Sequence, residues 1–141
     1  MVPLLRDQGL SLIAYFPLGS GLLTGKYRPG EPAPPGSRGA RATDTFPYQD
    51  PALLALAAAV EAVADEIQAR PAHVALAWLW YYAEVASTIV GARLVEQLQE
   101  NLGALAITLP DDARRRLDAA SERFAHGEPL GDYRLDERKE G

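Results

Sequence analysis

A glycine-rich stretch near the start of the chain carries the first residues whose types and spacing suit a chemical role. Residues 15–27 read Tyr-Phe-Pro-Leu-Gly-Ser-Gly-Leu-Leu-Thr-Gly-Lys-Tyr and follow an apolar run. Glycines let a backbone approach a phosphate closely, and exposed N–H groups then supply hydrogen-bond donors. Lys26 adds a positive charge that can face the phosphate. The stretch therefore suits phosphate binding, and the alternative is a turn-rich connector with a solvated lysine.

A second candidate site follows the next apolar run, at residues 91–101, which read Gly-Ala-Arg-Leu-Val-Glu-Gln-Leu-Gln-Glu-Asn. A helix is expected to begin here, and helix N-termini bind anions. Arg93 can hold a phosphate by charge-assisted hydrogen bonds. Gln97 and Asn101 are four residues apart and share a helix face, where side-chain amides suit the edge of a purine. The alternative is an ordinary capped surface helix.

The remaining polar residues form no catalytic or metal-binding pattern. The chain has no cysteine, which excludes disulfides, thiolate zinc sites and a cysteine nucleophile. His73 falls in an expected helix and His126 in a polar C-terminal segment, and we interpret each as an ordinary surface or helix residue. The acidic pairs at 65–66 and 111–112 are typical of solvated helix faces, and no metal-ligand spacing is present. We therefore predict no catalytic residue and no metal site.

The elements that must position the two candidate sites follow from apolar runs and chain breakers. Residues 1–8 are expected to end a helix before a glycine. The near-continuous apolar run at 10–16 predicts a strand buried on both faces, as in parallel sheets. Residues 17–51 are rich in proline and glycine and predict a long loop with a short helical turn at 22–26. A second strand is expected at 85–90.

Four helices complete the predicted order. Asp50 and Pro51 suit an N-cap and first helical position, and apolar residues at helical spacing then predict an amphipathic helix to about Ala69. Pro71 opens a helix that is apolar nearly all round, as buried helices are, and further helices are expected at 94–102 and 111–124. Strands alternating with helices indicate parallel α/β architecture. Both candidate sites then lie at carboxyl ends of strands, where such folds bind ligands.

Length and composition exclude several classes of protein. The 141 residues carry 14 basic and 19 acidic side chains, a net charge of −5, and 48% are hydrophobic, which fits a single soluble domain. A complete eight-stranded α/β barrel needs about 250 residues. Mild acidity gives no footprint for nucleic acid, no apolar run is long enough for a membrane span, and no signal-peptide core is evident. We expect a cytoplasmic location.

Taken together, these blocks resemble the aldo-keto reductase family. The motifs are the stretch at 15–27, a later Ala-Leu-Ala-Trp-Leu, and Ile-Val-Gly-Ala-Arg followed by Glu-Gln-Leu-x-Glu-Asn-Leu-Gly-Ala-Leu. Their order and spacing match the family as well as their residues, over residues 2–122. The resemblance implies a helix-rich α/β fold that is part of a (β/α)8 TIM barrel, namely its last two strands with the following helices.

The resemblance also implies an NADP cofactor and the residues that bind it. The family's equivalent of Tyr15 stacks on the nicotinamide ring, and residues 17–21 line the pyrophosphate passage. Lys26 and Arg38 would lie near the adenosine phosphates, while residues of 91–101 would enclose the adenosine end, where Arg93 favours a 2′-phosphate. The expected cofactor-binding residues are Tyr15, Pro17, Leu18, Gly19, Gly21, Lys26, Arg38, Gly91, Arg93, Gln97, Glu100 and Asn101.

Two residues depart from the family pattern. Phe16 stands where a small hydroxyl residue is frequent, so a hydrogen bond to the cofactor is expected to be lost. Arg70, just before Pro71, replaces the usual small hydroxyl residue that caps the helix.

The family's chemistry uses an Asp, a Tyr, a Lys and a His from the earlier part of the barrel, and no motif in this chain matches them. We therefore expect the C-terminal cofactor-binding portion of an NADP-dependent aldo-keto reductase, from a truncated or split reading frame, inactive alone. Residues 1–125 would form the barrel portion, and residues 126–141 would form a polar C-terminal tail.

Two parallel strands leave unpaired edges and uncovered apolar faces, so further burial is expected. The expected partners are a dinucleotide and either the missing N-terminal half-barrel or a second copy of the chain. One alternative is a non-catalytic nucleotide-binding or protein-interaction module that pairs with another half-barrel. Another is a helical protein that buries its two strands by dimerising.

Overall fold

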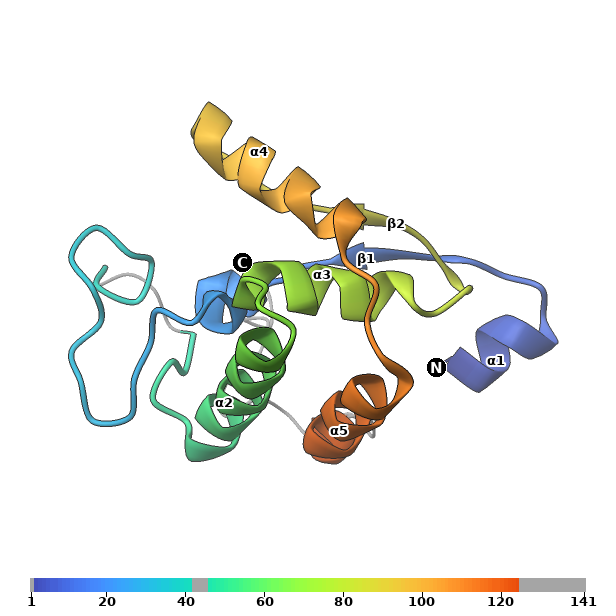
Figure 1. Cartoon of the computed structure of the whole chain (residues 1–141), viewed down its shortest axis with the longest axis horizontal. Coiled ribbons are helices and arrows are strands. Elements are labelled where there is room, and N and C mark those ends of the chain that lie inside the picture. Colours follow the sequence, from blue (N-terminus) through green and yellow to red (C-terminus); the bar gives the residue numbers. More distant parts are fainter. Residues whose placement is uncertain (1, 42–45, 125–141) are drawn as a thin grey trace, which may run out of the picture.

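The computed structural model describes residues 2–41 and 46–124, which form two strands and a set of helices (Figure 1). The predicted polar tail at 126–141, with His126, lies outside the described residues. In chain order the elements are α1 (Val2–Asp7), β1 (Leu12–Tyr15), η1 (Gly19–Thr24), α2 (Pro51–Glu66), α3 (Pro71–Trp80), β2 (Val85–Ile89), α4 (Val95–Gly103), η2 (Ala104–Ala106), α5 (Asp111–Ser121) and η3 (Glu122–Phe124).

The two strands pair in parallel, and Tyr15 lies opposite Ile89 near their carboxyl ends. Parallel neighbours need a long crossover, which η1, α2 and α3 supply here. Helix α3 contacts β2 and lies between the strand pair on one side and α2 and α5 on the other (Figure 1). The predicted parallel α/β architecture is confirmed, and the loops that follow the two strands start at one edge of the sheet.

The prediction that the first strand is buried on both faces is wrong. Ala14 is buried, whereas Ile13 and Tyr15 are 61% and 72% exposed. Successive side chains of a strand point to opposite faces, so Ile13 and Tyr15 share a face with Ile89, which is also exposed. The apolar run suits a strand that is covered from both sides, but within the described residues one face of the sheet stays open.

The start of α2 follows the predicted capping pattern. The Oδ1 atom of Asp50 accepts hydrogen bonds from the backbone N–H groups of Ala52 (2.8 Å) and Leu53 (3.1 Å). Such a cap contributes about 1 kcal/mol to helix stability. The helix ends at Glu66, before the predicted Ala69, because Gln68 adopts a left-handed conformation with φ of 53° and turns the chain toward α3.

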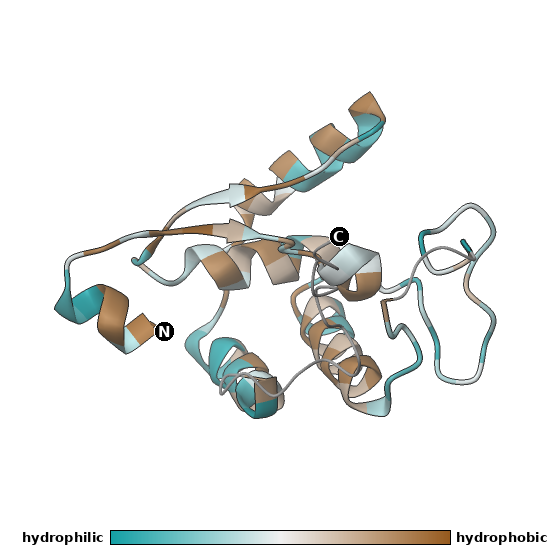
Figure 2. Cartoon of the chain, turned by 180° about the vertical axis from the view of Figure 1, so that it is seen from behind, coloured by the Kyte–Doolittle hydropathy of each residue, from teal (hydrophilic) through white to brown (hydrophobic). Residues whose placement is uncertain are grey.

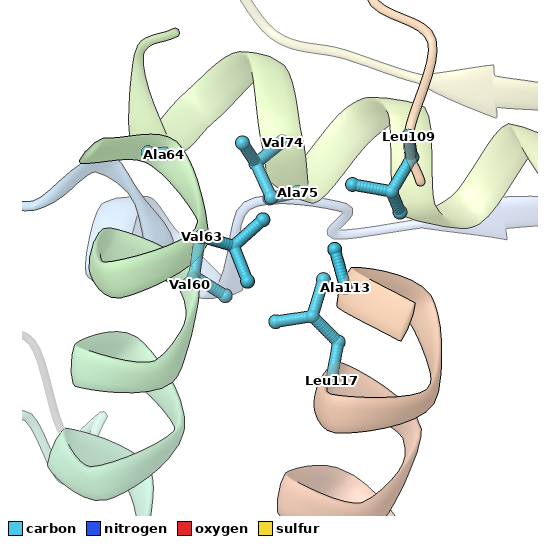
Figure 3. Packing of buried hydrophobic residues seen from close by; sticks show 8 residues of the cluster. All are labelled: Val60, Val63, Ala64, Val74, Ala75, Leu109, Ala113 and Leu117. Carbon is cyan, nitrogen blue, oxygen red and sulfur yellow. The ribbon is translucent and has the colours of Figure 1, made fainter. Parts of the chain in front are cut away.

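The main core lies between three helices and not between a helix and the sheet. Figure 3 shows Val60 and Val63 from α2 meeting Val74 from α3 and Leu117 from α5. Leu109, in the segment before α5, closes the cluster. Each of the four helical residues is almost fully buried. The chain thus gains its apolar burial on the side of α3 away from the strands.

A smaller core holds the long loop after η1 against α2. The rings of Tyr27 and Tyr48 stack with their centroids 4.5 Å apart. The Gly39 backbone N–H donates to the Tyr27 hydroxyl at 3.1 Å. Leu22 and Leu53 are buried in the same cluster. These contacts fold the segment 27–41 back toward the start of the loop.

Helix α4 presents an apolar face to solvent, visible as the brown outer side of this helix in Figure 2. Its polar side meets α3, because Glu100 on that side pairs with Arg70 of α3. The exposed apolar face, here called the apolar stripe, consists of Leu94, Val95, Leu98, Leu102 and Leu105.

Among the described residues, no helix combines the length and apolarity needed to cross a membrane.

Candidate functional site

The glycine-rich loop makes tight, non-helical turns directly after β1. Gly19, Ser20 and Gly21 have positive φ angles of 52°, 53° and 89°. The backbone N–H groups of Gly19 and Gly21 donate to the carbonyl oxygens of Phe16 (3.0 Å) and Leu18 (2.9 Å). Backbone hydrogen bonds between residues three apart are typical of tight turns. These two backbone donors, expected to be available to a phosphate, are therefore satisfied within the loop.

The loop brings its lysine back onto its own glycines. A Cβ atom placed on Gly21 would lie 2.7 Å from the Lys26 Nζ atom, so glycine is what allows this approach. The same ammonium group lies 5.4 Å from the centroid of the Tyr27 ring. Lys26 is exposed, and it is the charged group that this loop presents to a ligand.

Arg38 joins the same region from the middle of the long loop. Its guanidinium carbon lies 5.8 Å from the centroid of the Phe16 ring, a cation–π contact. The Phe16 ring in turn lies 4.9 Å from the Tyr15 ring. The Phe16 ring thus lies between the predicted residues Tyr15 and Arg38 and contacts both.

The second loop begins beside the first, because β1 and β2 are paired. Gly91 has open space beside its backbone, since no atom lies within 4 Å of a Cβ placed there. Arg93 is exposed. The Gln97 Oε1 atom accepts hydrogen bonds from the backbone N–H groups of Arg93 (2.8 Å) and Leu94 (3.4 Å). Gln97 therefore caps the start of α4. Its side-chain oxygen already accepts these two hydrogen bonds, so it is not free to bind the edge of a purine.

Two contacts tie the middle of α4 to α3. The Arg70 Nη1 atom lies 2.8 Å from the Glu100 Oε1 atom. The His73 Nε2 atom lies 2.7 Å from the Glu100 carbonyl oxygen. A Cβ on Gly103 would lie 2.9 Å from the His73 ring, so the helices approach closely here. His73 is therefore a residue of α3 that contacts the backbone of α4. The Arg70 side chain does not cap the start of α3.

The two loops form one candidate nucleotide-binding edge. Figures 1 and 2 both show the strands pointing toward the end of the molecule where η1 lies and α4 begins. In the part of the chain that the structure describes, no carboxylate pairs with Lys26, Arg38 or Arg93 within 4.0 Å. Three exposed cations without acidic partners suit the phosphates of a dinucleotide, so these residues fit such a cofactor.

A polar cluster on the opposite side of α3 joins this helix to α5. Asp118 of α5 accepts hydrogen bonds from Trp78 Nε1 (2.8 Å), the Tyr82 hydroxyl and the Arg114 guanidinium. Burial, followed by the hydrogen bond to Asp118, raises the pKa of Tyr82 above its usual value. A phenol with a raised pKa is a weaker proton donor, in keeping with Tyr82 as a packing aromatic. No group of three metal-ligating side chains occurs within residues 2–41 and 46–124.

Arg70 departs from the family pattern in the sequence, but its ion pair with Glu100 is not predicted there. A basic residue at a position where a capping hydroxyl is expected is the sequence signal for a different role. Its partner Glu100 could not be identified from the sequence, because it lies 30 residues away. The predicted binding roles of the twelve residues remain predictions. The structure places Tyr15, Lys26 and Arg38 at one loop and Arg93, Gln97 and Glu100 at the next.

Comparisons with known proteins match most of the chain. The model of the aldo/keto reductase family matches residues 1–122. An uncharacterised oxidoreductase of Mycobacterium tuberculosis is 38% identical over 134 residues, which cover 88% of this chain and 38% of that protein. An aldo-keto reductase of Schizosaccharomyces pombe named for NADP(+) is 29% identical over 117 residues, covering 83% of this chain and 34% of that one.

A solved structure shows the same fold. The chain is similar to the glycerol dehydrogenase of Gluconobacter oxydans with a TM-score of 0.65 and 22% identity. The match covers 87% of this chain and 37% of the dehydrogenase. The chain therefore spans between 34 and 38% of the length of these three proteins. The expectation of a partial barrel that contains two of its strands is confirmed.

Proposed function

The chain belongs to the aldo/keto reductase family, and from this premise we propose that it is the cofactor-binding portion of an NADP-dependent oxidoreductase of carbonyls and alcohols. The observation that carries the proposal is the pairing of β1 with β2, which sets two loops bearing unpaired cations at one edge of the sheet. A relative named for NADP(+) supports the same choice of cofactor. When bound, a nicotinamide cofactor would supply the hydride.

Each side of the edge contributes a different contact in this proposal. The Tyr15 ring is exposed at the end of β1 and can stack on a planar ring. Lys26 and Arg38 carry the charges that would face the pyrophosphate and adenosine phosphates. Arg93, at the start of α4, would hold a 2′-phosphate, and this contact favours NADPH over NADH.

The chain is proposed not to reduce carbonyls by itself. Hydride transfer to a carbonyl needs a positioned acid to protonate the developing alkoxide. The family's catalytic Asp, Tyr, Lys and His belong to the earlier part of the barrel, and no motif in this sequence matches them. Tyr15 and Lys26 stand at cofactor positions and are not assigned to proton transfer.

The purified chain is expected to bind NADPH. When an aldehyde is added, the absorbance of NADPH at 340 nm is expected to stay unchanged. Arg93→Gln is expected to weaken NADPH binding about tenfold, because a charge-assisted hydrogen bond contributes about 1.5–3 kcal/mol and tenfold in affinity is about 1.4 kcal/mol. Binding is measured by calorimetric titration.

The matched control for this experiment is Arg115→Gln, which removes an exposed arginine of α5. Its affinity for NADPH is expected to equal that of the unaltered chain. Turnover of NADPH by the purified chain would contradict the proposed inactivity, and equal losses from the two arginine variants would contradict the role of Arg93.

A second candidate function is a non-catalytic module that pairs with another half-barrel. The apolar stripe and the open face of the sheet favour it, because large apolar side chains exposed together mark interaction surfaces. In this case the burial that the two strands lack comes from a partner, either a complementary half-barrel or a second copy.

If the stripe is such a surface, the purified chain is expected to self-associate as its concentration rises, and Leu98→Asp is expected to shift it toward the monomer. The charge would have to be buried at the interface, which costs several kcal/mol. Light scattering against concentration measures the effect. Leu4→Asp is the control, at a leucine of α1 that is 62% exposed, compared with 50% for Leu98. A chain that stays monomeric at all concentrations would argue against a second copy as the partner.

A further inference from the structure

Four residues of the apolar stripe recur at a spacing that helices use to pair with one another. Val95, Leu98, Leu102 and Leu105 follow each other at intervals of three, four and three residues. These are the intervals between the a and d positions of a heptad, whose side chains interlock with those of a second helix. The four side chains, here called the α4 seam, are 50–69% exposed and belong to the brown outer side of α4 in Figure 2.

Contacts on the opposite side of α4 fix the direction in which the seam faces. The Arg70 Nη1 atom of α3 lies 2.8 Å from the Glu100 Oε1 atom, and the His73 Nε2 atom lies 2.7 Å from the Glu100 carbonyl oxygen. Ala104, one turn after Glu100, is buried. Because this side of α4 is held against α3, the seam on the far side is presented to solvent by the folded chain.

The spacing of the seam is the same when it is read backwards. If two copies of α4 lie antiparallel, Val95 of each copy is opposite Leu105 of the other, and Leu98 is opposite Leu102. Each a residue then meets a d residue, so all four side chains of both copies are covered in one register. A symmetric dimer needs a surface that is complementary to itself in this way.

Uncharged residues flank the middle of the seam, with Gln99 on one side and Asn101 on the other. In an antiparallel pair with two-fold symmetry, each flank meets the same flank of the other copy. A charge at position 99 or 101 would therefore face its own copy and repel it. The acidic residues Glu96 and Glu100 occupy helix positions away from the seam. Neutral amides on both flanks thus favour a second copy as the partner.

The ends of the helix favour the antiparallel arrangement over the parallel one. The N-terminus of α4 carries a partial positive charge from the helix dipole, and Arg93 lies just before it. A parallel pair would place two such N-termini and two copies of Arg93 side by side. An antiparallel pair places each N-terminus beside the C-terminal end of the other helix, where the dipoles attract.

We propose that the α4 seam binds the α4 seam of a second copy of this chain, antiparallel, in a symmetric dimer. This inference rests on the second candidate function, because it names the partner of the apolar stripe, and it does not depend on dinucleotide binding. Four seam residues per copy are few beside the about 20–30 residues a side of a standard interface. The dimer is therefore expected to be reversible, with a dissociation constant in the micromolar range.

The first test places charges at the flank nearest the two-fold axis. Gln99→Lys and Gln99→Glu are each expected to weaken self-association about threefold, because like charges then face each other. An equimolar mixture of the two variants is expected to associate at least as well as the unaltered chain, because opposite charges then meet. Sedimentation velocity against concentration measures each sample. Glu96→Lys, on α4 but away from the seam, is the matched control and is expected to change nothing.

The second test uses the absence of cysteine from the chain, so that each variant carries a single thiol. A short bis-maleimide is expected to cross-link Gln99→Cys into dimers. It is expected to leave Val95→Cys as monomers, because the rise of about 1.5 Å per residue places the two Val95 positions about 15 Å apart along the antiparallel helices. Glu96→Cys measures cross-linking by random collision. Circular dichroism of every variant checks that the helices are kept.

The outcomes separate this inference from the functions proposed above. If the unaltered chain stays monomeric, the inference is overturned, while a complementary half-barrel remains the partner of the second candidate function. If the chain associates but cross-links through Val95→Cys and not Gln99→Cys, the stripe is an interface and the antiparallel arrangement is overturned. If mixing the two charged variants restores nothing, the contact between the two copies of Gln99 is overturned. NADPH titration of the same samples tests the cofactor proposal independently.

Discussion

Leu117→Ala is expected to lower the free energy of unfolding by about 2–5 kcal/mol, the usual range for deleting a buried leucine side chain. Leu117 is 0% exposed and packs from α5 against Val60 and Val63 of α2 and Leu109 of the preceding segment. Removing it leaves a cavity at the point where the helices meet. Urea unfolding followed by circular dichroism at 222 nm measures the change.

The control is a leucine that the fold leaves uncovered. Leu105, in the apolar stripe, is 69% exposed, so Leu105→Ala is expected to change stability by less than about 0.5 kcal/mol. Similar losses for the two variants would contradict a core placed among α2, α3 and α5. The contrast also tests whether the chain folds around its helices while the outer side of α4 stays open to solvent.

Local patterns were sufficient to predict the helices of this fold. Asp50 followed by Pro51 marked the start of α2, and the apolar spacing that includes Val60 and Val63 marked its buried side. Capping and periodicity act within a few residues, so they can be recognised in a single sequence. The exact end of α2 was not predicted, because it depends on the left-handed conformation of Gln68.

The burial of the strands could not be predicted in the same way. The apolar run that includes Ile13 and Tyr15 correctly indicated a strand, but exposure depends on which elements cover each face. An apolar side chain indicates that a residue can be buried, but not which element covers it. Here the described residues cover only one face of the sheet. The stacking of Tyr27 on Tyr48, which folds the long loop, likewise joins residues far apart in sequence.

The candidate site shows the same division between local and distant information. The glycines and Lys26 were identified from their spacing, and the structure adds that Lys26 lies against Gly21. The sequence also suggests free backbone donors, but the tight turns of the loop use those of Gly19 and Gly21 internally. The pairing of Arg70 with Glu100 required the packing of α4 on α3, which no local motif encodes.

Gly21→Ala is expected to weaken NADPH binding about a hundredfold, or about 2.7 kcal/mol, with only a modest loss of stability. An added Cβ would lie 2.7 Å from the Lys26 Nζ atom and 3.1 Å from its Cε atom, so the flexible end of the Lys26 side chain must shift from its place against Gly21. A charge-assisted hydrogen bond to phosphate is worth about 1.5–3 kcal/mol. The positive φ of 89° adds about 1–2 kcal/mol of backbone strain for alanine, which favours other loop conformations.

Gly30→Ala is the matched control, because it imposes similar backbone strain without displacing a side chain. Gly30 has a φ of 72°, and no atom lies within 4 Å of a Cβ placed there. The two variants are therefore expected to lose similar stability in urea unfolding, while only Gly21→Ala loses affinity for NADPH in calorimetric titration. Equal affinities for the two variants would show that the lysine held over the glycine turn does not contact the dinucleotide. That result would transfer the anion-binding role to Arg93, the one basic residue of the segment 91–101.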